Sequence, residues 1–181
     1  MSVKRRNPRP LTSARLEELA LAYVARFATT QAKLRAYLQR KLRERGWEDE
    51  GTPPIDDLVS RYAELGYIDD EAWARMKAGS LMRRGYGRRR VAEALGHAGI
   101  EEDVREDLRA SEGDQRRAAL IMARRRRFGP FAVQPVDRPA REKHLAAMLR
   151  AGHPLDIARR IVDATDPDET EEWVESAFGD E

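Results

Sequence analysis

The stretch Leu65-Gly66-Tyr67-Ile68-Asp69-Asp70 ends one predicted helix and begins the next with almost no room for a loop. Apolar residues recur at helical spacing from Ile55 to Leu65, and either aspartate can cap the helix that follows. Glycine suits the left-handed position after a helix, where the next residue, Tyr67, packs back on Tyr62. Such a junction fixes the angle between successive helices, so it is typical of a joint between stacked modules.

The same glycine junction recurs at equal spacing. Gly46-Trp47, Gly99-Ile100 and Gly152-His153 follow one another at intervals of 53 residues. In the same cap geometry, each second residue would pack on an apolar residue five positions upstream. These pairs are Trp47 with Leu42, Ile100 with Leu95, and His153 with Met148. Recurrence of one local pattern at a fixed period predicts an internal repeat.

The sequence therefore predicts an all-α fold of three tandem three-helix repeats that form an elongated, curved array. The predicted repeats cover residues 14–66, 67–110 and 111–165. In the third repeat, the proline-containing segment 128–139 is expected to be an irregular connection. A basic tail, 1–13, and an acidic tail, 166–181, carry so much charge that we expect little ordered structure in either.

Composition excludes several function classes. The chain has no cysteine, so it can form neither a disulfide nor a thiolate metal site, and a cytoplasmic location is expected. No segment has the length and apolar character of a signal peptide or a membrane span. The three histidines, His97, His144 and His153, lack metal-ligand spacing, and no P-loop is present. Gly85-Tyr86-Gly87 lies between arginines and follows no strand, so it is no dinucleotide fingerprint. We therefore expect no catalytic residue, metal or cofactor.

Charge is segregated along the chain although the net charge is only +2. The segment 75–90 has seven basic residues and no acidic one, and the segment 116–127 has six arginines and no acidic residue. From Asp166 to the end of the chain there are eight acidic residues and no basic one. The middle of the chain is therefore the candidate for contact with a polyanion.

The two basic clusters differ in their position on the predicted helices. Cations at 124–127 lie at a helix C-terminus, where the dipole stabilises them, so fold stability can explain some of them. Arginines 88–90 follow Gly87 at a helix N-terminus, where the dipole disfavours them, and this indicates an anion site for phosphates or carboxylates. Tyr86, expected to be exposed, could stack on a base or fill a partner's pocket. The candidate binding residues are Arg83, Arg84, Tyr86, Arg88, Arg89, Arg90, Arg124, Arg125, Arg126 and Arg127.

Several motifs, taken in order, resemble a known family. The first repeat contributes Tyr23-Val24-Ala25-Arg26-Phe27, then Leu34, Leu38, Lys41 and Leu42, then Arg45-Gly46-Trp47. The second contributes Ile68-Asp69-Asp70-Glu71-Ala72-Trp73-Ala74, Arg84-Gly85-Tyr86-Gly87-Arg88-Arg89-Arg90-Val91, Glu93 to Leu95, and Gly99-Ile100. In order and spacing, these motifs resemble the RecX family, the regulators of the RecA recombinase. The resemblance spans about residues 14 to 164, and the connection 128–139 and the acidic tail depart from the shared pattern.

This resemblance implies tandem three-helix repeats and binding in the groove of the RecA nucleoprotein filament. It further implies lower ATP hydrolysis and strand exchange, with roles in DNA repair, recombination and the SOS response, and it supplies no catalytic residue. Two alternatives remain open. The chain could bind single- or double-stranded DNA directly and compete for it, or it could be a helical scaffold for another protein. No long exposed heptad demands a dimer, so a monomer is expected.

Overall fold

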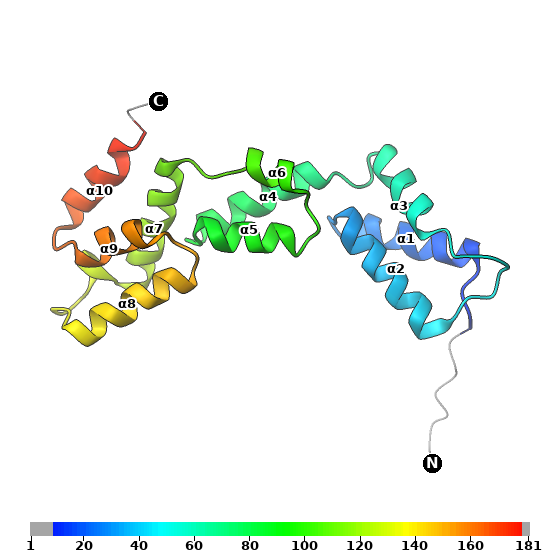
Figure 1. The fold of residues 1–181 in the computed structure, drawn as a ribbon, viewed down its shortest axis with the longest axis horizontal. Helices are drawn as coiled ribbons and strands as arrows, with labels where there is room; N and C mark the ends of the chain where they lie inside the picture. Colours follow the sequence, from blue (N-terminus) through cyan, green and yellow to red (C-terminus); the bar gives the residue numbers. More distant parts are fainter. Residues whose placement is uncertain (1–8, 179–181) are drawn as a thin grey trace, which may run out of the picture. The chain divides into compact units, whose positions relative to one another are not determined.

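Helices make up nearly all the regular structure in the computed structural model, which describes residues 9–178 (Figure 1). They are α1 Ser13–Arg26, α2 Gln31–Arg45, α3 Ile55–Glu64, α4 Asp70–Arg83, α5 Arg88–Gly96, α6 Glu102–Asp107, α7 Glu112–Arg126, η1 Gly129–Phe131 (a 3-10 helix), α8 Arg138–Arg150, α9 Leu155–Asp163 and α10 Pro167–Ser176. Within residues 9–178 there is no β-strand beyond one isolated bridge. The predicted all-α helical array is confirmed.

The described chain divides into two units. Unit 1 contains residues 9–73 and 98–100, and unit 2 contains residues 74–97 and 101–178, so the boundary falls inside α4. The short segment 98–100 belongs to unit 1 because the Thr30 hydroxyl donates to the Ala98 carbonyl at 2.6 Å. The boundaries of the three repeats stay a prediction, as does the curved shape of the array.

In unit 1, the chain just before α1 is part of the core. Leu11 is fully buried, and its backbone forms a parallel bridge with Trp47. Its N–H donates to the Gly46 carbonyl, and its carbonyl accepts from the Glu48 N–H, each at 2.9 Å. The prediction of a disordered tail over 1–13 is therefore wrong at its end, where burial of one leucine fixes the backbone. Residues 1–8 lie outside the described residues.

The junction that follows α3 has the predicted geometry. Gly66 has φ +74°, and the Tyr67 N–H donates to the Tyr62 carbonyl at 2.9 Å. The two tyrosine rings meet edge to face with centroids 5.5 Å apart. Asp69 caps α4 by accepting from the Ala72 N–H at 2.8 Å, whereas the Asp70 carboxylate accepts from the Gln31 N–H at 3.0 Å at the start of α2. The paired aspartates thus bind N–H groups at the starts of two helices, α4 and α2.

The other predicted junctions agree in part. Gly99 and Gly152 have φ +75° and +94°, and the His153 N–H donates to the Met148 carbonyl at 3.2 Å, as predicted. Gly46 differs, because its ψ of 174° extends the chain after α2. Trp47 therefore pairs with Leu11 through the backbone, and the predicted cap geometry is wrong there.

Two predictions concern the C-terminal part of unit 2, namely the connection after α7 and the acidic segment after Asp166. The irregular connection after α7 is confirmed as far as residue 137, with only η1 as regular structure, whereas residues 138 and 139 of the predicted connection already lie in α8. The acidic segment after Asp166, by contrast, forms α10, which packs against α7 (Figure 1). Thr170 and Val174 are buried, and Asp166 caps the helix through the N–H groups of Asp168 and Glu169. Apolar burial at helical spacing therefore outweighs the charge that suggested disorder. In the described range, no helix has the length and apolar character needed to cross a membrane.

Candidate functional site: an arginine-rich face of unit 2

The two predicted arginine clusters lie on either side of one close backbone contact in unit 2. Gly85 comes two residues after the end of α4 and has φ +80°, and the next N–H, of Tyr86, donates to the Leu81 carbonyl at 3.1 Å. A Cβ atom at Gly85 would lie 2.9 Å from the backbone nitrogen of Met122 in α7. Arg84 and Tyr86 flank this glycine, and Arg124 comes two residues after Met122. The fold thus brings the clusters around 84 and 124 toward each other.

The N-terminus of α5 is already occupied by the backbone of the α8–α9 junction. The Gly87 N–H donates to the Ala151 carbonyl at 2.9 Å, and the Arg89 N–H donates to the Gly152 carbonyl at 3.2 Å. These are the groups that an anion would use at a helix N-terminus. The predicted anion site at this helix N-terminus is therefore wrong as far as these backbone donors are concerned.

Side chains near the start of α5 differ in how far they are engaged. The Arg89 guanidinium donates to the Leu149 carbonyl at 2.7 Å, and both Arg89 and Arg90 lie within 4 Å of Glu93 carboxylate oxygens, at 3.9 and 3.3 Å. Arg88 is exposed and forms no ion pair with any described residue. Tyr86 is half-buried rather than exposed, with the Arg84 guanidinium 5.4 Å from its ring centre. It therefore offers only part of a ring to a partner.

The arginines at the end of α7 are all exposed. Arg124 forms an ion pair with Glu171 of α10. The next three arginines form none within residues 9–178. We define the free arginine set as the predicted site residues that are exposed and have no ion pair among the described residues. Its members are Arg83, Arg84, Arg88, Arg125, Arg126 and Arg127. Their role in binding stays a prediction.

Arg127 has an unusual backbone conformation. It is the one described non-glycine residue with positive φ, at +58°, and it occupies the left-handed position after α7. Five other helices of the described chain have glycine with positive φ at their ends, namely Gly46, Gly66, Gly85, Gly99 and Gly152. An arginine here costs about 1 kcal/mol relative to glycine, so fold stability does not explain its presence.

Replacing Arg127 with glycine is expected to stabilise unit 2 by about 1 kcal/mol, because glycine adopts positive φ without the Cβ penalty. Urea unfolding followed by circular dichroism measures the change. As a control, Arg126→Gly places glycine inside the last turn of α7 and should destabilise by a similar amount. Equal effects of the two substitutions would contradict the conformational explanation.

His153 links the end of α8 to the Gly85 turn. Its side chain is buried, and Nε2 donates to the Gly85 carbonyl at 3.0 Å. Burial lowers the pKa of His153 below its ordinary value, and the bond to the Gly85 carbonyl opposes this shift. Burial also lowers the pKa of His144, which stacks on Phe128. Both imidazoles are therefore structural groups of unit 2.

Acidification is expected to destabilise unit 2 through His153. In the unfolded chain this imidazole takes up a proton near pH 6.5, whereas the folded chain resists it. Stability is therefore complete above that pH and declines as the pH falls toward the folded-state pKa, by up to about 1.4 kcal/mol per pH unit. Urea unfolding from pH 7.5 to pH 5 measures the slope. His153→Gln keeps a donor but does not titrate, so an unchanged slope in this variant would refute the assignment.

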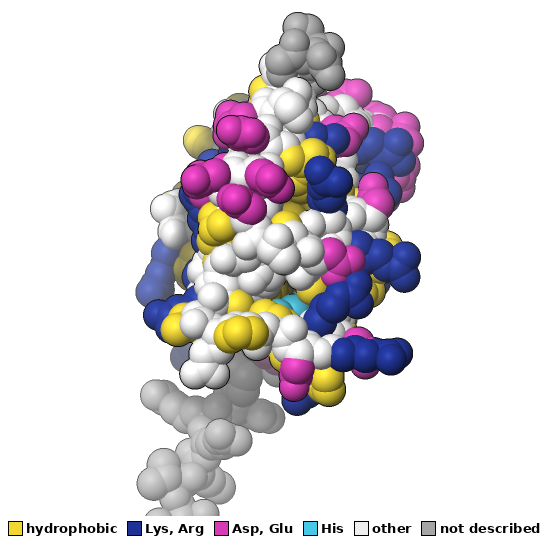
Figure 2. All heavy atoms as spheres, turned by 90° about the vertical axis from the view of Figure 1, so that its left-hand side faces the viewer, with side chains coloured by type: hydrophobic (Ala, Val, Ile, Leu, Met, Phe, Trp, Pro, Cys, Tyr) yellow, Lys and Arg dark blue, Asp and Glu magenta, His cyan; other side chains and the backbone are white. Residues whose placement is uncertain are grey.

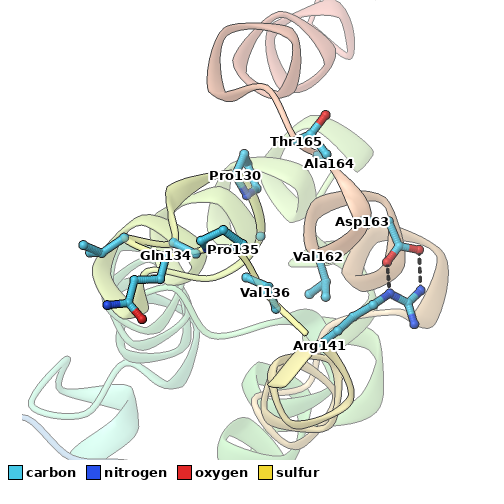
Figure 3. Close-up of a pocket in the computed structure, with 12 residues that line it drawn as sticks. Pro130, Gln134, Pro135, Val136, Arg141, Val162, Asp163, Ala164 and Thr165 are labelled. Carbon is cyan, nitrogen blue, oxygen red and sulfur yellow. Dashed lines mark hydrogen bonds and ion pairs between the residues drawn. The ribbon is translucent and has the colours of Figure 1, made fainter. Parts of the chain in front are cut away.

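Two cavities of unit 2, of about 570 and 560 Å³, have no member of the free arginine set in their lining, whereas Arg88 lines a small one of about 60 Å³ beside α5 and α6. The first of these cavities is lined by the connection after α7 and by α8 and α9 (Figure 3). At its edge, the Arg141 guanidinium donates to both carboxylate oxygens of Asp163, at 2.5 and 2.6 Å. In the described residues no group of three or more histidine, aspartate or glutamate side chains could hold a metal ion.

These features define a class of protein: an all-α helical array whose unit 2 carries the free arginine set. Comparison with known proteins then identifies the family. The family model "RecX, second three-helix domain" matches residues 69–108, which lie inside the predicted second repeat. A regulatory protein RecX of Myxococcus xanthus is 34% identical, covering 88% of this chain and 90% of the relative. One from Pseudomonas putida is 33% identical, covering 75% and 83%. The chain belongs to the RecX family, a family of regulatory proteins.

A solved structure shows the same fold. The crystal structure of RecX from Lactobacillus salivarius has a TM-score of 0.64 and is 18% identical, covering 88% of this chain and 97% of that one. This likeness agrees with the helical array described above.

Sequence reasoning missed two features of this face. Gly85 lies against the backbone of Met122, and Gly87 lies against the backbone of Gly152. The sequence around these glycines gave no sign of either contact. The acidic helix α10 also supplies partners to arginines of α7. A signal for α10 was present, since Thr170, Trp173 and Val174 have helical spacing after a capping aspartate.

Proposed function

We propose that this protein binds the RecA nucleoprotein filament and lowers its ATP hydrolysis and strand exchange. The observation that carries this proposal is membership of the RecX family, whose relatives are named regulatory proteins. The free arginine set of unit 2 adds physical support, because exposed guanidiniums without carboxylate partners can bind phosphates or acidic side chains.

The proposed inhibition comes from several weak contacts acting together. Each exposed charge contributes little alone, but contacts joined in one chain act at a high effective concentration once the first has formed. A filament presents the same surfaces repeatedly, so it suits such a binder. No enclosed catalytic chemistry is needed for this role.

A titration of RecA ATPase on single-stranded DNA tests the proposal. The protein is added in increasing amounts while DNA is kept in large excess. Inhibition at protein concentrations far below that of the DNA sites is the expected result. Inhibition only at concentrations that coat the DNA would favour the alternative, direct competition for nucleic acid, and would refute filament binding.

A further inference from the structure

The acidic helix α10 covers part of the arginine-rich surface of α7. Seen end-on, unit 2 shows a group of acidic side chains near the C-terminal end of the chain, with basic side chains around it (Figure 2). Arg116, Arg117 and Arg124 of α7 all contact α10. These are half of the six arginines in the acid-free segment 116–127. The cover is thus supplied by the chain's own carboxylates.

The three arginines are held with different strength. Arg116 is an anchor: its guanidinium donates to the Trp173 carbonyl at 2.8 Å and lies 4.5 Å from the indole centre, and only 17% of its side chain is exposed. Arg117 lies 3.7 Å from Glu175, with 49% and 67% of the two side chains exposed. Arg124 pairs with Glu171, with 48% and 39% exposed. Exposed pairs of this kind contribute little to stability and are screened by salt.

We propose that Arg117 and Arg124 form a polyanion-binding surface that Glu171 and Glu175 occupy until nucleic-acid phosphates displace them. The two arginines are seven positions apart on α7, so they project from one side of the helix about two turns from each other. Arg125, Arg126 and Arg127 continue the positive charge from there without carboxylate partners in the described chain. Guanidinium binds phosphate with the same planar geometry that it uses for carboxylate.

Exchange of partners requires no unfolding of α10. Thr170 and Val174 are buried on the inner side of α10, and Arg116 donates to the Trp173 carbonyl. The helix therefore stays in place when the Glu171 and Glu175 carboxylates release their arginines. Arg117 and Arg124 can therefore bind phosphates at any time, but competition from Glu171 and Glu175 lowers their affinity for phosphates. This inference rests on the proposed function only for the class of ligand, a polyanion.

The test is binding of a fluorescent single-stranded oligothymidylate, without RecA, followed by anisotropy at several salt concentrations. Glu171→Gln/Glu175→Gln removes the carboxylate partner of each arginine and preserves side-chain shape, while the Arg117 guanidinium keeps its contact with the Phe178 ring, whose centre is 4.0 Å away. Each phosphate neutralised on a single strand adds about 0.7 to the salt slope, so two contacts should steepen it by about 1.4 and raise affinity at least about fivefold at 0.1 M salt.

Asp168→Asn/Glu172→Gln is the matched control, because it removes the same two charges from exposed positions of α10 that have no ion pair among the described residues. We expect it to leave the salt slope unchanged. Adding Arg117→Ala/Arg124→Ala to the Glu171→Gln/Glu175→Gln variant should abolish the gain. Equal affinity and slope in the two charge variants would overturn the proposal, and would leave filament binding, which the ATPase titration measures, unaffected.

Discussion

Replacing Gly87 with alanine is expected to destabilise unit 2 by about 3 kcal/mol, at the upper end of the cost of overpacking a closed site. The added Cβ would lie 2.3 Å from the Gly152 carbonyl carbon and 2.4 Å from its oxygen. Both neighbours are backbone atoms, so no side chain can move aside. The α5 N-terminus must separate from the α8–α9 junction, with loss of the bonds to Ala151 and Gly152. Urea unfolding followed by circular dichroism measures the loss.

Gly51→Ala is the matched control for this prediction. Gly51 has φ +80°, and a Cβ added there would meet no other atom within 4 Å, so only the backbone penalty of about 1 kcal/mol applies. Gly152→Ala should resemble Gly87→Ala, because its Cβ would lie 2.4 Å from the Arg90 nitrogen. If Gly87→Ala unfolds at the same urea concentration as the unsubstituted protein, the backbone contact in unit 2 does not exist as described.

Removing three free arginines, with Arg83→Ala/Arg84→Ala/Arg88→Ala, is expected to weaken inhibition of the RecA ATPase about 10- to 150-fold. This estimate assigns about 0.5 to 1 kcal/mol to each exposed charge that meets an opposite charge in the complex. None of the three forms an ion pair among residues 9–178, so their loss should leave helical circular dichroism unchanged. The protein concentration needed for half-inhibition is the measured quantity.

The control variant removes the same number of exposed arginines elsewhere, with Arg40→Ala/Arg43→Ala/Arg138→Ala. Arg40 and Arg138 pair only along their own helices, with Glu44 and Glu142. Each variant changes net charge equally, so a general charge effect would affect both. Half-inhibition at the same concentration for the two variants would show that the free arginine set has no special role.

Local chemistry made the helical joints predictable. The pair Gly66-Tyr67 indicated its conformation, because few residues other than glycine adopt the left-handed position. The apolar residue that follows then packs back on the helix that has just ended. The same reasoning failed at Gly46, where Trp47 is drawn to Leu11, a residue 36 positions earlier. Contacts distant in sequence leave no mark in a local pattern.

The residues of the candidate site were predictable from the sequence, but their hydrogen-bond and ion-pair partners were not. The arginines at 83–90 and 124–127 stand out from charge segregation alone, and the structure finds most of them exposed. The N–H groups of Gly87 and Arg89 already donate to carbonyls, because Gly152 lies close to the start of α5. This approach depends on tertiary packing alone. The partners of Arg117 and Arg124 likewise depend on where α10 docks.

The most direct test compares binding of the protein to a RecA filament with binding to the same DNA alone. The chain has no cysteine, so Glu50→Cys, at an exposed position of unit 1, accepts a single fluorescent label. Anisotropy is followed as filament assembled on single-stranded DNA, or the bare DNA, is added at one salt concentration. The account predicts that half-saturation with filament needs at least about tenfold less DNA-equivalent than with bare DNA, a preference of about 1.4 kcal/mol. Equal half-saturation points would contradict it.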